Sequence, residues 1–189
     1  MKIFFTGSPR ALKTKRENHE RIYNALGKKG THLSDLVVKA DPDNFYHTEY
    51  DYVIKHYKRT IQDLKKADIF VAEVSMHSMS MGYLVNKALE LSKPVIALYT
   101  TGHEPFFLTG LDDSRLQIVE YNLNDVEHKV EDAIDYAASQ QDTRFNFFVA
   151  PKHINFLDWV SQSKKIPRSV FLRKLIEREM ANDEQYNNQ

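Results

Sequence analysis

Short apolar runs alternate with amphipathic stretches along the first three quarters of the chain. The apolar runs, which have the character of strands, are residues 2–6, 32–38, 69–74, 95–99 and 116–121. Stretches with helical spacing of apolar positions run to residue 29 and then over 46–66, 82–91 and 126–138. Mostly apolar strands that are separated by helices are typical of a parallel sheet covered on both faces. The pattern predicts an α/β, flavodoxin-like five-stranded parallel sheet with helices on both faces.

A different pattern begins at residue 144. Two sets of side chains alternate with a period of two over residues 144–149, which predicts a strand with two distinct faces. One set is Phe145, Phe147 and Val149, and the other is Arg144, Asn146 and Phe148. Two short amphipathic helices follow, the first after Pro151 and the second opened by residues 166–169. A strand and two helices cannot bury their apolar side alone, so this pattern predicts a dimer.

These patterns divide the chain into four parts. Residues 1–139 are predicted to form a ligand-binding α/β domain, and residues 140–143 a polar linker. Residues 144–180 are predicted to form a small strand–helix–helix module. Residues 181–189 are predicted to be a polar tail.

Composition is that expected of a soluble protein of the cytoplasm. The 189 residues are 42% hydrophobic and 28% charged, which is ordinary for a globular protein. No run of about 18 apolar residues could span a membrane, and the apolar start is too short for a signal peptide. The absence of cysteine excludes disulfides and thiolate metal sites. None of the eight histidines forms a His-x3-His pair beside a carboxylate, so we expect neither a metal nor a cofactor.

The net charge of zero hides an asymmetry along the chain. Residues 144–180 carry eight Lys or Arg against three acids, a net charge of +5. Residues 1–143 have a net charge of −3, and the tail over 181–189 adds −2. A basic module on a slightly acidic protein indicates a polyanionic partner. The alternative is a solvated helix face with a chance excess of basic residues.

Two strand-to-helix loops carry side chains suited to a phosphate. The first follows the strand at 2–6, and the second, rich in serine and methionine, covers residues 75–83. Ligands of doubly wound sheets bind at the carboxyl ends of the strands, where hydroxyls, guanidinium groups and helix N-termini hold phosphate oxygens. The candidate residues are Gly7, Ser8, Pro9, Arg10, Ser78, Ser80 and Gly82. The alternative is that the serines only cap the helices that follow.

Several motifs over residues 1–138 occur in an order and spacing that point to one enzyme family. They are Gly7-Ser8-x-Arg10, Ala67-Asp68, Val71-Ala72-Glu73-Val74, Ser78, Gly82-Tyr83 and Asp113-Ser114-Arg115. They resemble the deoxynucleoside 5′-monophosphate N-glycosidases, which are hydrolase relatives of the nucleoside 2-deoxyribosyltransferases. The resemblance implies a 5′-phosphate held by the glycine loop and by the serines that follow the third strand. By that resemblance the phosphate ligands are Ser8, the backbone of Pro9, Arg10, Ser78 and Ser80, the last standing where the family has glycine.

The residues that the resemblance assigns to catalysis are replaced in this chain. Leu84 follows Gly82-Tyr83 where the family has its nucleophilic glutamate, and Thr60 stands where the family has an aspartate. Leucine cannot form a glycosyl-enzyme bond or stabilise an oxocarbenium ion, and threonine is no general acid at neutral pH. A serine that the neighbouring subunit supplies is also replaced, near Pro105. We therefore expect the chain to have no catalytic residues. The alternative is that a nearby acid, Glu73 or Glu104, substitutes for the missing ones and that activity is retained.

The strand–helix–helix module resembles the ribbon-helix-helix DNA-binding fold of the Arc and Met repressors. In that fold, strands from two chains form an antiparallel ribbon that enters the major groove. Arg144 can form a bidentate bond to guanine, and Asn146 to adenine. Phe148 stands where a third polar reader is usual, so it either contacts a thymine methyl or packs inward at a bulge. The resemblance also implies a phosphate contact by the backbone near Arg168 and Ser169. The alternatives are a dimerisation arm, or a sixth strand and a helix docked on the sheet.

Together these features predict a homodimeric, sequence-specific DNA-binding regulator, with a higher even oligomer also possible. Its partners are double-stranded DNA and a nucleoside monophosphate or related sugar phosphate, which the N-terminal domain senses. An active nucleoside-monophosphate N-glycosidase or 2-deoxyribosyltransferase with a C-terminal dimerisation arm is the alternative. A scaffold that binds neither ligand is the third hypothesis.

Overall fold

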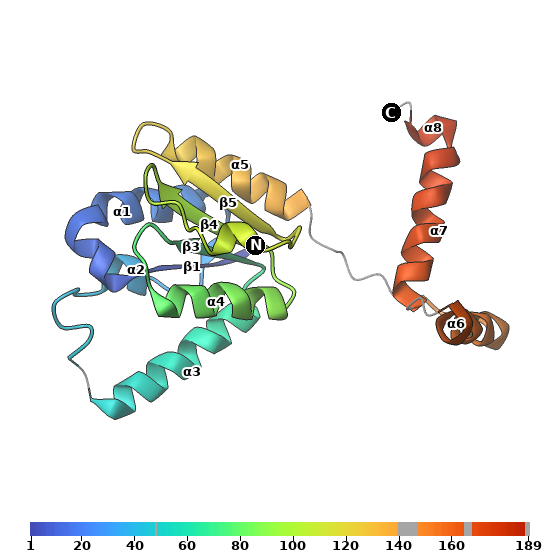
Figure 1. Ribbon diagram of the computed structural model, residues 1–189, viewed down its shortest axis with the longest axis horizontal. Helices are drawn as coiled ribbons and strands as arrows, with labels where there is room; N and C mark the ends of the chain where they lie inside the picture. The colour runs from blue at the N-terminus through green and yellow to red at the C-terminus, as the bar shows by residue number, and fades with distance from the viewer. Residues whose placement is uncertain (48, 140–146, 165–167, 188–189) are drawn as a thin grey trace. The chain divides into compact units, whose positions relative to one another are not determined.

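Figure 1 shows the protein as a computed structural model, which describes residues 1–47, 49–139, 147–164 and 168–187. The chain divides into two compact units, Met1–Asp142 and Thr143–Gln189. The N-terminal unit contains the sheet, and the described part of the C-terminal unit is helical.

The N-terminal unit is built on five parallel strands. They are β1 (Lys2–Gly7), β2 (Thr31–His32), β3 (Ile69–Glu73), β4 (Val95–Thr100) and β5 (Leu116–Tyr121). Their order across the sheet is β2-β1-β3-β4-β5, and every neighbouring pair is parallel. The order reverses between β1 and β3, as in flavodoxin-like doubly wound sheets, whose ligands bind at that switch point. The prediction of a five-stranded parallel α/β sheet is confirmed.

Helices cover both faces of this sheet (Figure 1). On one face, α1 (Leu12–Lys29) and α5 (Val126–Ser139) pack over a core that includes Ile3 and Phe5 of β1. On the other face, α3 (Tyr50–Lys66) and α4 (Met79–Glu90) pack over a core that includes Phe4 and Phe70. Successive side chains of a strand point to opposite faces, so β1 contributes to both cores.

The prediction of a strand over residues 32–38 is wrong. β2 ends at His32, and the short helix α2 (Leu36–Lys39) follows. The His32 ring stacks on Tyr23 with 3.7 Å between ring centroids, and its Nε2 donates a hydrogen bond of 2.8 Å to the Tyr23 carbonyl. The Ser34 hydroxyl then accepts a hydrogen bond from the Leu36 amide, where the helix opens. Because β2 is an edge strand with one neighbour, these local side-chain contacts end it early.

Two helices that border the predicted ligand loops begin at residues other than those expected. α3 begins at Tyr50 rather than at residue 46. α4 begins at Met79 rather than at residue 82, with Ser78 as its N-cap residue. The loop after β3 is therefore shorter than predicted, and Ser80 and Gly82 lie on the first turns of α4.

The C-terminal unit contains the two predicted helices. They are α6 (Pro151–Lys164) and α7 (Arg168–Asn182). A third short helix, α8 (Glu184–Asn187), follows, so part of the predicted polar tail is helical. Between α6 and α7, Phe156 packs edge-on against Phe171 with 5.9 Å between ring centroids, and Leu157 and Val160 are buried. None of the helices in the described parts of the chain has the length and apolar character that a membrane span requires.

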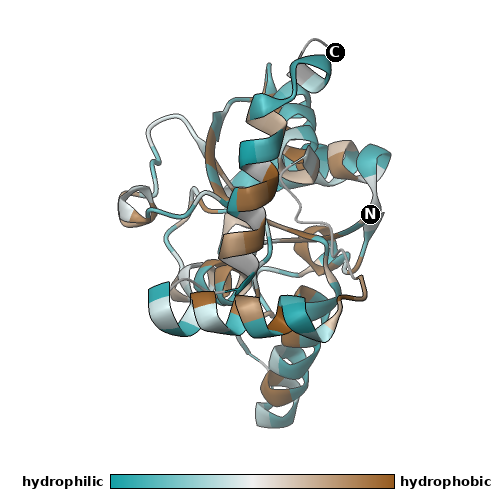
Figure 2. Cartoon of the chain, turned by 90° about the vertical axis from the view of Figure 1, so that its right-hand side faces the viewer, coloured by the Kyte–Doolittle hydropathy of each residue, from teal (hydrophilic) through white to brown (hydrophobic). Residues whose placement is uncertain are grey.

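Much of the apolar surface of the C-terminal unit is exposed. The large apolar side chains exposed there are Phe147, Phe148, Ile154, Phe156, Trp159, Ile176, Met180 and Tyr186. Figure 2 shows hydrophobic and hydrophilic residues mixed along the helices of this unit. Residues 147–150 have no regular secondary structure, and the rest of the predicted ribbon strand lies outside the described residues. A ribbon needs a second chain as its ladder partner, so the ribbon-helix-helix fold stays a prediction.

Replacing Gly7 with alanine should destabilise the N-terminal unit. Gly7 ends β1 opposite Glu73, and an alanine Cβ at this position would lie 2.6 Å from Nε2 of His19. His19 is fully buried, so its ring has no free space into which to move. Overpacking of this kind costs about 1–3 kcal/mol. We expect urea denaturation to show a loss of this size in the free energy of unfolding of Gly7→Ala.

The matched control is Gly82→Ala. An alanine Cβ at Gly82 would meet no atom within 4 Å. Gly82 lies inside α4, where alanine is favoured over glycine by about 0.5–1 kcal/mol. This variant should therefore be at least as stable as the wild type, and equal destabilisation by both substitutions would contradict the account of Gly7.

Candidate ligand-binding site

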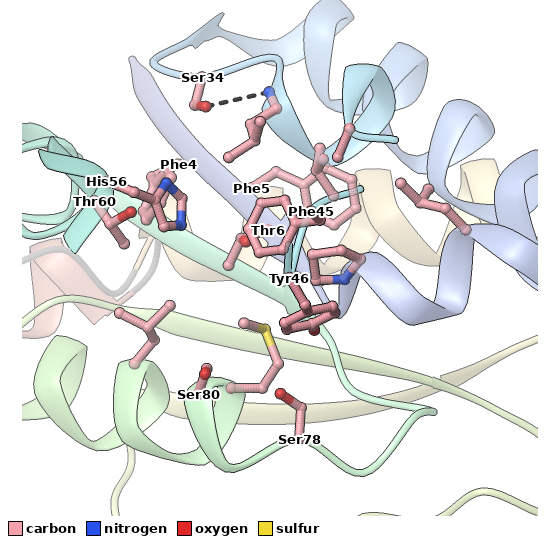
Figure 3. A pocket seen from close by; sticks show the side chains of 18 of the residues that line it. Phe4, Phe5, Thr6, Ser34, Phe45, Tyr46, His56, Thr60, Ser78 and Ser80 are labelled. Atoms are coloured by element: carbon pink, nitrogen blue, oxygen red, sulfur yellow. Dashed lines mark hydrogen bonds between the residues drawn. The ribbon is translucent and has the colours of Figure 1, made fainter. Parts of the chain in front are cut away.

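A cavity of about 280 Å³ lies at the switch point of the sheet. Its walls come from β1 and the loop after it, from residues 34–53, from α3 and from the first turns of α4. Figure 3 shows these walls, with side chains from α3 and α4 on different sides of the space. The hydroxyl-bearing residues of the wall are Thr6, Ser34, Tyr46, Tyr52, Thr60, Ser78 and Ser80. The cavity thus combines hydroxyl groups with aromatic rings, a combination suited to a polar aromatic ligand.

The loop after β1 forms one edge of this cavity. Gly7 and Pro9 line it directly, and Pro9 begins a short 3₁₀ helix that ends at Ala11. Ser8 is the N-cap residue of that helix, but its side chain makes no capping hydrogen bond and is buried. The alternative explanation of Ser8, that its side chain caps the helix that follows, therefore does not hold in this structure.

Arg10 lies beside the cavity rather than in its wall. Its side chain is exposed, and the guanidinium carbon lies 4.7 Å from the centroid of the Tyr46 ring. Tyr46 itself lines the cavity. A guanidinium over an aromatic face is held by a weak cation–π contact. An anion bound at the loop could therefore draw Arg10 away from Tyr46 at small cost.

The serine loop after β3 contributes hydroxyls from the other side. Ser78 and Ser80 both line the cavity (Figure 3). Ser78 is the N-cap residue of α4, yet its hydroxyl makes no capping hydrogen bond, which leaves it available to a ligand. Gly82 does not line this cavity. It borders a second one, of about 290 Å³, that shares Ser78 and Met81 with the first.

The two residues that the resemblance sets at catalytic positions both line the cavity. Leu84 of α4 and Thr60 of α3 both line it, and Leu84 is also buried in the core of that face. None of the described residues that line the cavity carries a carboxylate. In the described parts of the chain, no cluster of three or more His, Cys, Asp or Glu side chains could hold a metal ion. The described wall of the cavity therefore offers hydroxyl groups, aromatic rings and one imidazole, but no carboxylate.

The two nearby acids lie elsewhere. Glu104 is exposed, and Glu73 is fully buried in a polar cluster behind the glycine loop. Glu73 accepts hydrogen bonds from the hydroxyls of Ser75 and Tyr121, and its other oxygen lies 3.8 Å from Nε2 of His19. Burial, together with the nearby Glu73 carboxylate, raises the pKa of Tyr121 far above its ordinary value. Glu73 thus joins β3 to its neighbours and does not face the cavity.

His56 is a cavity residue that the sequence analysis did not single out. It lies on α3, half-buried, and it lines the cavity beside Thr60 (Figure 3). Burial lowers the pKa of His56, and the positive charge of Arg59 lowers it further. The sequence contains one signal for it, the spacing of four residues that puts His56 and Thr60 on the same helix face.

The residues predicted to contact DNA belong to the C-terminal unit. Arg144 and Asn146 lie outside the described residues, and Phe148 is fully exposed. Arg168 begins α7, where its guanidinium forms an ion pair with Asp158 of α6. Ser169 lies in the first turn of α7, and its side chain is outside the described part.

Comparisons with known proteins relate the chain to nucleotide N-hydrolases. The 5-hydroxymethyl-dUMP N-hydrolase of Mus musculus is 29% identical over 139 residues, which cover 66% of this chain and 75% of that protein. The putative 2′-deoxynucleoside 5′-phosphate N-hydrolase 1 of Nematostella vectensis is 35% identical over 100 residues, which cover 52% of this chain and 67% of that protein. The solved structure of a Clostridium botulinum CMP N-glycosidase is 18% identical with a TM-score of 0.47, covering 72% of this chain and 98% of that chain. No protein-family model matches the chain.

Arg10→Ala should weaken the binding of a deoxynucleoside monophosphate about ten- to a hundredfold. That range corresponds to one charge-assisted hydrogen bond of roughly 1.5–3 kcal/mol. Isothermal titration calorimetry at low salt measures the change. Lys58→Ala is the control, because Lys58 is an exposed cation of α3 outside the cavity wall. Similar weakening by both variants would show that general charge, and not Arg10, governs the affinity.

Proposed function

The chain belongs to the family of 2′-deoxynucleoside 5′-phosphate N-hydrolases, and from this premise we propose that it is a sensor rather than a hydrolase. The proposal is a homodimeric cytoplasmic regulator that binds specific DNA sequences through its C-terminal unit. Its N-terminal unit binds a nucleoside monophosphate or a related sugar phosphate and leaves it intact.

The observation that carries the sensor proposal is the chemistry of the cavity wall. Two serines and the glycine loop offer hydroxyl and backbone groups, and Arg10 lies beside them. These groups and the N-terminus of α4 suit a phosphate. The walls carry no carboxylate among the described residues that form them.

Hydrolysis of an N-glycosidic bond needs more than phosphate binding. The transition state carries positive charge on the sugar, which a carboxylate stabilises or attacks, and an acid protonates the leaving group. Leu84 and Thr60 can do neither of these things. His56 of α3 also lines the cavity, but burial lowers its pKa, which favours the neutral imidazole and makes it a poor acid at neutral pH.

The DNA-binding part of the proposal rests on charge and exposed apolar surface. Residues 144–180 have a net charge of +5, which favours a polyanion. The exposed apolar side chains of α6 and α7 favour burial against a second copy of the same unit. A dimer would bring two copies of the 144–149 segment together, as a ribbon requires.

The second candidate function is an active N-hydrolase. This candidate is favoured by the relatives of the chain, which are named as N-hydrolases of 5-hydroxymethyl-dUMP and of 2′-deoxynucleoside 5′-phosphates. In that case Glu104 or a residue of a second chain would have to supply the missing carboxylate, and the C-terminal unit would serve as a dimerisation arm.

The wild-type protein should release no free base from any deoxynucleoside 5′-monophosphate. The physical reason is the absence of a nucleophile and a general acid from the described wall of the cavity. Chromatography of overnight reactions, with 5-hydroxymethyl-dUMP in the substrate panel, measures the release. Base release well above that of heat-inactivated protein would replace the sensor with the N-hydrolase.

Arg144→Ala and Asn146→Ala should each reduce the binding free energy for the cognate DNA site by about 1–3 kcal/mol and relax discrimination at one base pair. Lys164→Ala is the matched comparison, because its ammonium lies over the Trp159 ring on α6 and away from the predicted ribbon residues in sequence. If Lys164 contacts a phosphate, this variant should bind all DNA sequences more weakly by the same factor. The slope of the logarithm of affinity against the logarithm of salt concentration should then fall by about one unit. Selection of genomic fragments followed by binding assays at several salt concentrations measures these effects. No enriched sequence, together with unchanged binding by the Arg144 and Asn146 variants, would leave the C-terminal unit as a dimerisation arm.

A further inference from the structure

His56 has surroundings that phosphate binding does not explain. Its ring packs edge-on against Phe45, with 5.4 Å between centroids and 89° between planes. It also lies parallel to the Tyr52 ring at 6.1 Å. No hydrogen-bond partner for either ring nitrogen is found among the described residues. Two aromatic rings therefore fix the plane of an imidazole whose polar atoms are free to meet a ligand.

The cavity has two chemically different ends. Pro9 and Ser78 mark the end beside the glycine and serine loops, and His56 and Thr60 mark the α3 side. Figure 3 shows Ser78 well apart from His56. Apolar side chains such as Phe4 line the space as well. This arrangement suits a ligand with an anionic group at one end and a flat heteroaromatic ring at the other.

We propose that His56 selects the base of the bound nucleotide by hydrogen-bonding to the edge of that base from a neutral imidazole. This inference rests on the proposed function, since it requires the cavity to bind a nucleotide. A neutral imidazole offers one donor and one acceptor, so it distinguishes bases by the pattern of groups on their edges. His56 is then a specificity-determining residue and not a catalytic one.

The charge state of His56 gives the inference a pH signature. Burial and the charge of Arg59 favour the neutral imidazole in the free protein. The other titratable groups on the cavity wall are Tyr46 and Tyr52, and the side chains contributed by β1 and α4 are uncharged. A base that covers the imidazole buries it further and favours the neutral form more strongly. Affinity should therefore fall as the pH drops below the ordinary histidine pKa of about 6.5.

Calorimetric titration of the full-length protein tests the inference. The probes are the four common deoxynucleoside monophosphates and deoxyribose 5-phosphate, which has no base. The wild type should prefer one base, and His56→Leu should bind that nucleotide about three- to tenfold more weakly. Its affinity for deoxyribose 5-phosphate should not change.

Two further variants separate the role of the imidazole from other effects. His56→Gln keeps a donor and an acceptor but does not titrate, so it should retain only the pH dependence that comes from the phosphate, whose second pKa is about 6. His47→Gln is the matched control, because His47 is exposed and outside the cavity wall. It should behave as the wild type does. Circular dichroism confirms that each variant is folded before titration.

Each outcome decides one of the two proposals. In one contrary result, His56→Leu keeps the base preference of the wild type, and in another it loses as much affinity for deoxyribose 5-phosphate as for the nucleotides. Either result shows that base selection by His56 is wrong, and the sensor proposal then stands. If His56→Gln shows the same pH dependence as the wild type, the neutral-imidazole contact is also wrong. If the wild type binds neither the nucleotides nor deoxyribose 5-phosphate, the proposed function fails and this inference fails with it. If it binds only deoxyribose 5-phosphate, this inference alone fails.

Discussion

The parallel pairing of β1 with β3 is the constraint on which the ligand site depends. Its register sets Gly7 opposite Glu73, so both strands end at the same edge of the sheet. The strand order reverses at this pair, and the chain therefore leaves the two strands toward different faces, which opens a crevice. Gly7 has no side chain, and this lets the loop lie close to the buried His19. The cavity, the glycine loop and the serine loop all follow from this one pairing.

The described wall of the site carries hydroxyl groups but no carboxylate, and this combination supports the sensor proposal. The Ser78 hydroxyl, which makes no capping hydrogen bond, and Arg10, which lies over the Tyr46 ring, are available to an anion. The buried Glu73 accepts hydrogen bonds from Ser75 and Tyr121. Glu73 is buried and is not part of the cavity wall. In the proposed sensor, Leu84 and Thr60 line the cavity without supplying an acid, so a bound nucleotide would stay intact.

Much of the N-terminal fold could be predicted from the sequence because its strands are buried on both faces. The run over residues 69–74 is apolar except for Glu73, as expected of a strand in a sheet covered on both faces. The end of the edge strand β2 was mispredicted. It depends on side-chain hydrogen bonds of His32 and Ser34, which the spacing of apolar residues does not reveal. The loops of the site were predicted from their position after β1 and β3, whereas His56 was missed because a single histidine on a helix has no distinctive pattern. Gly82 was placed in the site by its motif, but the helix turns it toward the second cavity. The ribbon strand over residues 144–149 stays a prediction, because it would need a second chain as its pairing partner.

Phosphorus-31 NMR of a deoxynucleoside monophosphate, titrated with the full-length protein and followed for a day, tests the central claim most directly. It reports binding through the shift of the phosphate resonance and cleavage through the appearance of deoxyribose 5-phosphate. The account predicts a saturable shift for at least one nucleotide and no new resonance over that time. A phosphate resonance that no nucleotide shifts, or a deoxyribose 5-phosphate resonance that grows in proportion to protein concentration, would contradict it.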